Sequence, residues 1–310
     1  SVDDDNPAPI TLQQSGLTAS FTVPSTPGAY LVHIQIDDSY PATAIVNVRA
    51  DGSIDGQDLG RPPRDWRTEK VIYLAFVREF FDDDGDGEGD FLGFVDKMDY
   101  IAKLGVTTIW LMPLSEGPTT HGYATTGAFS IEGDYGDSSQ LELLTETAKA
   151  FGMETMMDFV ANHTSDRHPF FQTAIQSAPS SPIRDWYSFN PDGTYRFAFG
   201  FEGLPDNNQN NAMVRQTLLQ EVNWFMDRGL ENVRCDIAGF TPPSFWRAVR
   251  RQVKARAPNA VMLAEELPPQ AEYFDHAFDL AYDAQTFWAT RDAFAVNGSF
   301  DSVSGNLENA

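Results

Sequence analysis

Charged side chains stand at the ends of three short apolar segments of the sequence. Asp158 closes the segment METMMD, and Glu265 closes NAVMLAE. Arg234 and Asp236 both stand at the end of LENVRCD. A charge in an apolar segment is costly to bury unless a partner neutralises it, so each of these residues alone fits a structural ion pair. Several such charges on one face indicate a shared chemical role.

Two facing carboxylates are suited to the cleavage of a glycosidic bond. One of them attacks the sugar carbon, and the other holds a proton for the leaving oxygen. Asp236 fits the first role and Glu265 the second, with Glu266 as a competing acid. Arg234 lies two residues before Asp236 and points to the same side of a strand. We expect Arg234 to keep Asp236 ionised and therefore nucleophilic.

A parallel sheet would bring these residues together. From residue 71 onward, strand-like runs alternate with amphipathic helical segments, an order that predicts right-handed crossover connections. Five or six repeats favour a (β/α)8 TIM barrel over a doubly wound sheet, because no glycine-rich phosphate motif follows the first run. The predicted strands are 71–77, 106–113, 153–160, 230–237, 259–266 and 277–283. In such a barrel the catalytic residues lie at the carboxyl ends of the strands.

The rest of the chain divides into three parts. Residues 1–60 contain short β-branched runs separated by turn residues, which predicts a small N-terminal β domain, either carbohydrate-binding or a spacer. The stretch 51–70 has the composition of a linker. Residues 61–310 are assigned to the barrel, and the aromatic and Asn-rich segment at about 164–210 is predicted to be a lobe inserted after the third strand.

The composition limits the classes of partner that the protein is expected to bind. The chain of 310 residues has a formal net charge of −24, so nucleic acid and anionic membranes are not expected to bind it. The sequence contains no apolar run near the roughly 20 residues that span a bilayer. Cys235 is the only cysteine in the 310-residue sequence, which rules out a disulfide within it. A secreted or periplasmic location is favoured, with the cytoplasm as the alternative.

Five short motifs follow one another in a specific order. They are HGY (121–123), DFVANHT (158–164), LPDNN (204–208), VRCDIA (233–238) and MLAEE (262–266). Together they resemble the signature regions of glycoside hydrolase family 13, the α-amylase family, including members similar to oligo-1,6-glucosidases. The resemblance runs from about residue 71 to about residue 288 and leaves out 1–60.

The resemblance implies a retaining enzyme that acts on α-glucosidic bonds of starch-like oligo- or polysaccharides, by hydrolysis or by transfer. In this family the nucleophile forms a glycosyl-enzyme intermediate, and the acid/base serves both steps. The implied roles are nucleophile for Asp236, acid/base for Glu265, orientation of the nucleophile for Arg234, hydrogen bonding to the sugar for His163 and His121, stacking for Tyr123, and support from behind for Asp158 and Asn162.

An acidic loop, DDDGDGEGD (82–90), follows the first predicted strand. Its acidic residues recur at every second position, as in Ca²⁺-binding loops, although Gly93 stands where such a loop has its bidentate Glu. The candidate ligands of a structural Ca²⁺ are Asp82, Asp84, Asp86, Glu88 (through its carbonyl) and Asp90.

The sequence also departs from the family pattern. The Asn-His-Asp motif that supplies a third carboxylate is missing, and the chain stops at Ala310 before a seventh and an eighth strand and a C-terminal domain. Either a second chain or segment completes the barrel, or the rest was lost or truncated, and we expect negligible activity if nothing completes it. Ala124 and Gly127 stand where relatives commonly carry Asp. The alternatives are a catalytically inactive glucan-binding relative and a sucrose-isomerising enzyme.

Overall fold

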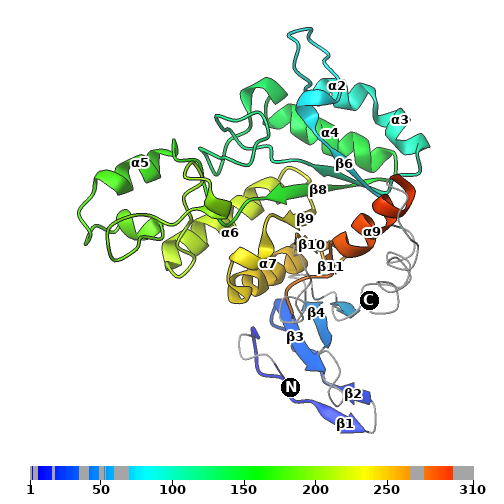
Figure 1. Ribbon diagram of the computed structural model, residues 1–310. Coiled ribbons are helices and arrows are strands. Elements are labelled where there is room, and N and C mark those ends of the chain that lie inside the picture. Colours follow the sequence, from blue (N-terminus) through cyan, green and yellow to red (C-terminus); the bar gives the residue numbers. More distant parts are fainter. Residues whose placement is uncertain are drawn as a thin grey trace.

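The computed structural model places most of the chain after residue 70 and several segments before it (Figure 1). The residues that the structure describes are 2, 6–15, 18–34, 42–48, 52, 54–58, 70–265 and 276–295. The competing acid Glu266 lies outside these ranges.

Six parallel strands form the central sheet. Along the sheet they follow the order of the sequence, each hydrogen-bonded to the next. The strands are β6 (Ile72–Ala75), β7 (Thr108–Leu111), β8 (Glu154–Phe159), β9 (Asn232–Cys235), β10 (Met262–Ala264) and β11 (Leu280–Ala281). A doubly wound sheet reverses its order at a switch point, whereas a barrel does not. The predicted fold class, an incomplete (β/α)8 barrel, is confirmed.

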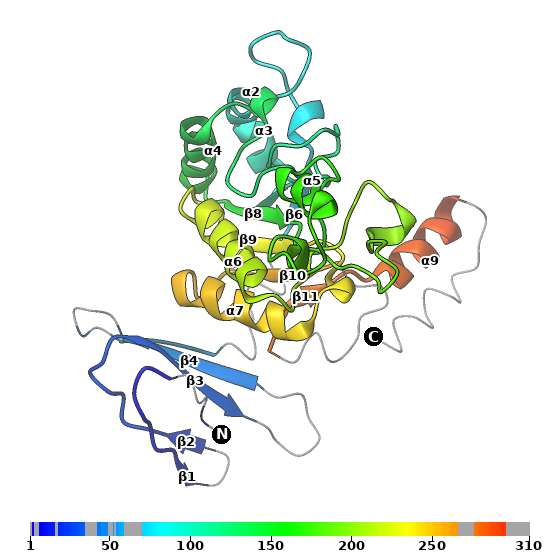
Figure 2. The same cartoon turned by 90° about the vertical axis from the view of Figure 1, so that its left-hand side faces the viewer.

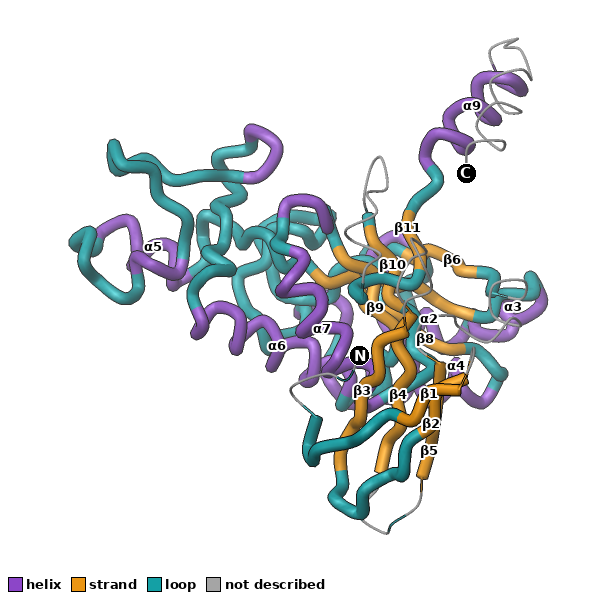
Figure 3. Tube along the Cα trace, turned by 90° about the horizontal axis from the view of Figure 1, so that it is seen from below, coloured by secondary structure: helices purple, strands orange, loops and turns teal. Residues whose placement is uncertain are grey.

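Helices cover one face of this sheet (Figures 1 and 2). They are α2 (Phe91–Asp96), α3 (Met98–Lys103), α4 (Ser138–Ala150), α6 (Ala212–Met226) and α7 (Pro243–Arg256). The last helix, α9 (Ala284–Ala295), follows β11 and projects away from the sheet (Figure 3). Asp137 and Gln140 form a capping box that begins α4. The buried Leu141, Leu144 and Ala148 of α4 recur at helical spacing and join the main core.

A smaller apolar cluster fills the concave face of the sheet. Trp110, Met156, Val261 and Leu263 come from or next to three of the strands and are buried together. They form a small apolar core that is separate from the main one.

The predicted lobe follows β8 and extends away from the sheet. It contains α5 (Pro169–Gln176) and two short 3-10 helices, η3 (Arg184–Trp186) and η4 (Ala198–Gly200). Its own small core is made by Phe171, Ala174 and Tyr187. Isolated bridges such as His163–Asp206 tie the returning chain to the end of β8.

The N-terminal segment forms antiparallel sheets below the barrel (Figure 3). The strands are β1 (Gln13–Ser15), β2 (Thr18–Ser20), β3 (Gly28–Ile34), β4 (Ala42–Val48) and β5 (Ile54–Asp58). The position of β5 corrects the predicted linker at 51–70, because residues 54–58 pair with β4. Their Gly and Asp content suggested a turn, but pairing with a neighbouring strand overrides local propensity. The assignment of 1–60 as a separate domain stays a prediction.

None of the helices in the described ranges combines the length and the apolar character that a membrane span requires.

Candidate active site

Arg234, at the end of β9, is the centre of a polar cluster on the sheet. Its Nη1 atom donates to Asp158 Oδ1 at 2.6 Å and to Asp236 Oδ1 at 2.8 Å. Its Nη2 atom donates to Glu265 Oε2 at 2.6 Å. Its Nε atom donates to the hydroxyl of Tyr282 at 3.0 Å. One buried guanidinium therefore joins side chains from the ends of β8, β9, β10 and β11.

The register of the strands explains this convergence. Asp158 and Leu263 are the direct neighbours of Arg234 on either side in the parallel ladder. The ladder continues past β9, because the amide of Asp236 donates to Phe159 O and the amide of Glu265 donates to Cys235 O, each at 3.0 Å. The backbone therefore fixes both carboxylates at the same edge of the sheet.

The turn after Asp236 is strained. Ile237 has φ 37° and ψ 54°, a left-handed conformation that β-branched residues rarely adopt. Its amide donates to Glu265 Oε2 at 3.0 Å. Strain of this kind persists where surrounding contacts hold it, commonly at functional sites. The turn thus links the two candidate catalytic carboxylates through one backbone N–H.

Asp158 is the most enclosed member of the cluster. Besides Arg234, it accepts hydrogen bonds from Trp110 Nε1 at 3.1 Å and from the Tyr123 hydroxyl at 2.9 Å. Its side chain is fully buried. Asp158 thereby holds both Arg234 and Tyr123 through its two carboxylate oxygens.

Three aromatic rings surround the guanidinium. Arg234 Cζ lies 5.0 Å from the ring centroid of Trp110, and 5.7 Å from those of both Tyr123 and Tyr282. Such contacts attract a cation to the ring face. The sequence analysis missed Trp110 and Tyr282, although both lie in predicted strands near the end that carries the site.

The charges of this cluster do not balance. Burial raises the pKa of Asp236 to about 8 against the effect of Arg234, and the carboxylates of Asp158 and Glu265 add to the rise. Arg234 lowers this pKa, which is the direction that the sequence predicted, but it shares its single charge among three carboxylates. Burial therefore favours the protonated form of Asp236, and the ionised nucleophile stays a prediction.

The two predicted sugar-binding histidines differ in environment. His163 is buried, its Nε2 donates to Tyr123 O at 3.2 Å, and burial lowers its pKa to about 4. Its Nδ1 therefore carries a free lone pair, and it has no hydrogen-bond partner among the described residues. His121 is exposed and stacks on Tyr123 with ring centroids 5.9 Å apart. Tyr123 connects both histidines to the carboxylate cluster.

Asn162 points away from the carboxylates. Its Nδ2 donates to Asp206 Oδ1 at 3.1 Å, which joins the end of β8 to the LPDNN segment. Both residues line a polar pocket of about 260 Å³ that also includes Phe240, close in sequence to Asp236. The structure thus brings together Asp158, Arg234, Asp236, Glu265 and Tyr123, and it places Asn162 in a neighbouring polar pocket.

The acidic loop brings three of its five predicted ligands together. One carboxylate oxygen from each of Asp82, Asp84 and Asp86 lies within 4.8 Å of the others. Asp90 is used differently, because its side chain accepts from the amides of Gly93 and Asp83 and caps α2. The structure therefore removes Asp90 from the predicted carboxylate cluster.

Glu88 also has another partner for its side chain. Its carboxylate pairs with Arg78 at 2.9 Å, and Arg78 also binds Asp134 at 2.9 Å. The carbonyl of Glu88, which the sequence suggested as the ligand, is not involved in this pair. The carboxylates of Asp82, Asp84 and Asp86 are hard oxygen donors of the kind that Ca²⁺ takes.

The chain is similar in sequence to known proteins. Residues 74–196 match the family described as alpha amylase, catalytic domain. The chain is 31% identical over 244 residues to alpha-amylase MalA of Haloarcula japonica, covering 78% of this chain and 36% of the relative. It is also 31% identical over 201 residues to an oligo-1,6-glucosidase of Heyndrickxia coagulans, covering 56% and 36%.

A solved structure has the same architecture. The ligand-free cyclic alpha-maltosyl-(1→6)-maltose hydrolase from Arthrobacter globiformis superimposes with a TM-score of 0.73 at 25% identity, covering 79% of this chain and 62% of that one. The chain spans 36% of the length of the two curated relatives above. The order of the strands, the motifs at their ends and these similarities lead to one conclusion: the chain belongs to the α-amylase family, glycoside hydrolase family 13.

Proposed function

We propose that the protein cleaves α-glucosidic bonds of oligo- or polysaccharides with retention of configuration, using Asp236 as nucleophile and Glu265 as acid/base. The observation that carries this proposal is the single guanidinium of Arg234, which holds both carboxylates at the ends of neighbouring strands. Its relatives include an alpha-amylase and an oligo-1,6-glucosidase, which supports this substrate class.

The reaction has two steps. Asp236 attacks the anomeric carbon while the carboxylic acid of Glu265 gives its proton to the leaving glycosidic oxygen, which leaves a glycosyl ester on Asp236. Glu265, now a carboxylate, then takes a proton from water, and that water displaces Asp236 from the sugar. Glu265 gives up a proton in the first step and regains one from water in the second. Both carboxyl groups therefore return to their starting protonation states.

A proton held between Asp236 and Glu265 would suit this reaction. Asp236 must be a carboxylate when it attacks, although burial favours its protonated form. We infer that the bound sugar is attacked in the state in which the proton lies on Glu265 and Arg234 stabilises the charge of Asp236. Arg234 is hydrogen-bonded to both groups, so it can stabilise the carboxylate of Asp236 without changing its hydrogen-bond partners.

The groups around the pair would bind the sugar. The unpaired Nδ1 of buried His163 is an acceptor for a sugar hydroxyl. Tyr123 presents its ring beside His121 and is held by Asp158, which suits stacking against a sugar face. These roles are proposals that rest on the position of each side chain next to the carboxylates.

We also propose that Asp82, Asp84 and Asp86 hold a structural Ca²⁺. The amides of Gly85 and Gly87 both donate to Asp82, at 2.6 Å and 2.9 Å, which keeps the short loop folded around the carboxylates. A bound cation would neutralise their mutual repulsion and anchor the loop between β6 and α2.

Sugar cleavage by the full-length protein tests the proposed activity. Maltooligosaccharides, isomaltose and sucrose are incubated with wild type, Asp236→Asn and Glu265→Gln, and products are separated by chromatography. We expect wild-type turnover of a glucan and a loss of about 10³-fold or more in Asp236→Asn. Binding of maltooligosaccharides without turnover would instead identify an inactive glucan-binding relative, and conversion of sucrose to an isomer would identify a different reaction.

A further inference from the structure

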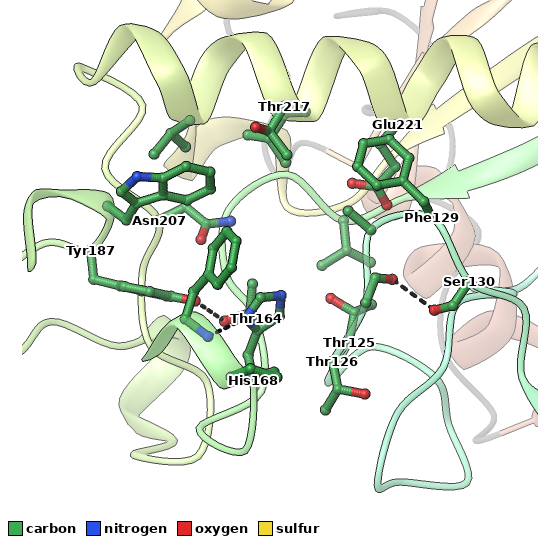
Figure 4. A pocket seen from close by; sticks show the side chains of 18 of the residues that line it. Thr125, Thr126, Phe129, Ser130, Thr164, His168, Tyr187, Asn207, Thr217 and Glu221 are labelled. Atoms are coloured by element: carbon green, nitrogen blue, oxygen red, sulfur yellow. Dashed lines mark hydrogen bonds between the residues drawn. The ribbon is translucent and has the colours of Figure 1, made fainter. Parts of the chain in front are cut away.

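A second cavity lies between α6 and the base of the lobe (Figure 4). Its volume is about 530 Å³, and its walls come from the loop after β7, the segment after β8, the lobe and one face of α6. Asp158, Arg234, Asp236 and Glu265 are not among its lining residues. The cavity is thus distinct from the carboxylate cluster, and neither the fold nor the proposed reaction uses it.

Glu221 lines this cavity from a position where the helix calls for an apolar residue. On α6 it shares the buried face with Val214, Leu218 and Val222. It is only 7% exposed, and its side chain has no hydrogen-bond or ion-pair partner among the described residues. A buried carboxyl without a partner lowers stability relative to an apolar residue of similar size. Glu221 therefore lowers the stability of the protein, and the fold alone does not explain its presence at this position.

The walls around Glu221 are aromatic. Phe129 comes from the loop after β7, while Phe170 and Trp186 come from the lobe and pack edge to face at 4.8 Å. Figure 4 shows Glu221 and Thr217 projecting from α6 into the cavity that Phe129 also lines. Among the described residues, none that lines the cavity is Lys or Arg. Ring faces together with one carboxyl and no competing cation are the groups that recognise an organic cation.

The other titratable groups that line the cavity do not supply charge near neutral pH. His168 accepts the amide of Phe170 through Nδ1, and burial lowers its pKa to about 4. Burial raises the pKa of Tyr187 to about 12, and its hydroxyl is hydrogen-bonded to Thr164. Of the lining side chains in the described part of the chain, Glu221 is therefore the one whose charge can respond to a bound cation.

We propose that this cavity binds a small organic ammonium ion, with its cationic head on the carboxylate of Glu221 and its apolar body against Phe129 and Trp186. Glu221 gives its proton to solvent as the cation enters, so one positive charge replaces another and the buried pair is neutral. The net charge of −24 raises the local concentration of cations around the protein. This proposal does not depend on the glycosidase reaction.

The test compares a permanent cation with a neutral molecule of similar shape. Benzyltrimethylammonium and benzyl alcohol are titrated into the full-length protein at about pH 6 and about pH 9, with isothermal calorimetry and tryptophan fluorescence as readouts. We expect the cation to bind more tightly than the alcohol, and its affinity to rise with pH as Glu221 loses its proton more readily. Equal affinities of the two probes, or tighter binding of the alcohol or of maltose in this cavity, would overturn the proposal.

Two variants locate the binding site. Glu221→Gln keeps the shape and removes the charge, so cation affinity should fall about tenfold or more and lose its pH dependence, while benzyl alcohol is unaffected. Glu146→Gln, an exposed acid on α4, is the control with the same loss of charge and should bind as wild type does.

Ala128→Phe provides an independent test from another element. Ala128 lines the cavity from the loop after β7, so a phenyl group there should fill the space and block both probes without touching α6. Unchanged cation binding in either Glu221→Gln or Ala128→Phe would show that the cation binds elsewhere.

Discussion

Arg234 Nη1 lies 2.6 Å from Asp158 Oδ1, and the two residues are also direct neighbours in the register of β9 and β8. The side chains are 4% and 0% exposed. The same contact that orders the candidate catalytic cluster therefore also joins two central strands. Changes at Arg234 should affect both the chemistry and the fold, and the two effects can be measured separately.

Loss of Arg234 should destabilise the protein strongly. Arg234→Met keeps the apolar part of the side chain but leaves three carboxylates without their shared cation, and breaking a buried ion pair typically costs about 3–5 kcal/mol. Urea denaturation at about pH 8 measures the change in the free energy of unfolding. Lys103→Met, which removes the exposed pair with Asp99, is the control and should change stability little. Equal effects of the two variants would contradict a structural role for the cluster.

The protonation of Asp236 should make stability depend on pH. The usual pKa of an Asp is 3.8, and burial raises that of Asp236 to about 8, so the folded protein keeps a proton that the unfolded chain loses. The resulting contribution to stability is fully present below about pH 4 and is lost as the pH rises to about 8. Asp236→Asn cannot lose this proton, so its melting temperature should exceed that of wild type by an amount that grows from about pH 5 to about pH 8.

The control for this titration is Glu146→Gln on the exposed face of α4. Its melting temperature should run parallel to that of wild type over the same pH range. A constant difference between Asp236→Asn and wild type would show that Asp236 is ionised in the folded protein throughout.

The acidic loop should bind Ca²⁺ through the three grouped aspartates. Terbium luminescence and the rise in melting temperature with added Ca²⁺ both report occupancy of the loop. Asp84→Asn should weaken binding at least about tenfold, because it removes one of three charged ligands. Asp83→Asn is a matched control, since Asp83 lies between two ligands but outside the cluster. If Asp83→Asn weakens binding as much as Asp84→Asn does, the loop attracts cations only through its total charge.

Much of the site could be predicted from the sequence because the strand ends carry it. The alternation of strand-like and helical segments placed Asp158, Asp236 and Glu265 at one edge of a sheet, and the structure brings all three to Arg234. The sharing of one guanidinium by three carboxylates could not be predicted, because it depends on the register of the strands, which a linear sequence does not display. Tyr282 was missed for the same reason.

Other features depend on contacts that local patterns do not encode. The spacing of Asp90 matched a metal-binding loop, but its side chain caps α2. Only the three-dimensional path of the backbone shows whether Asp90 acts as a metal ligand or as a helix cap. The segment 91–105 has the pattern of one helix, yet the structure divides it at Lys97, whose φ and ψ of −101° and 9° are not helical. The burial of Glu221 could have been predicted from the sequence, because Glu221 lies three residues after Leu218 on the apolar stripe of α6.

The central claim is that Asp236 forms a covalent bond to the sugar, and trapping of that intermediate tests it most directly. Glu265→Gln is incubated with α-glucosyl fluoride, whose leaving group needs no proton, so the first step proceeds while the second lacks its base. Mass spectrometry of the quenched protein should then show one added glucosyl residue, and peptide mapping should place it on Asp236. An adduct on any other residue, or a first-formed product with inverted anomeric configuration in wild type, would contradict the account.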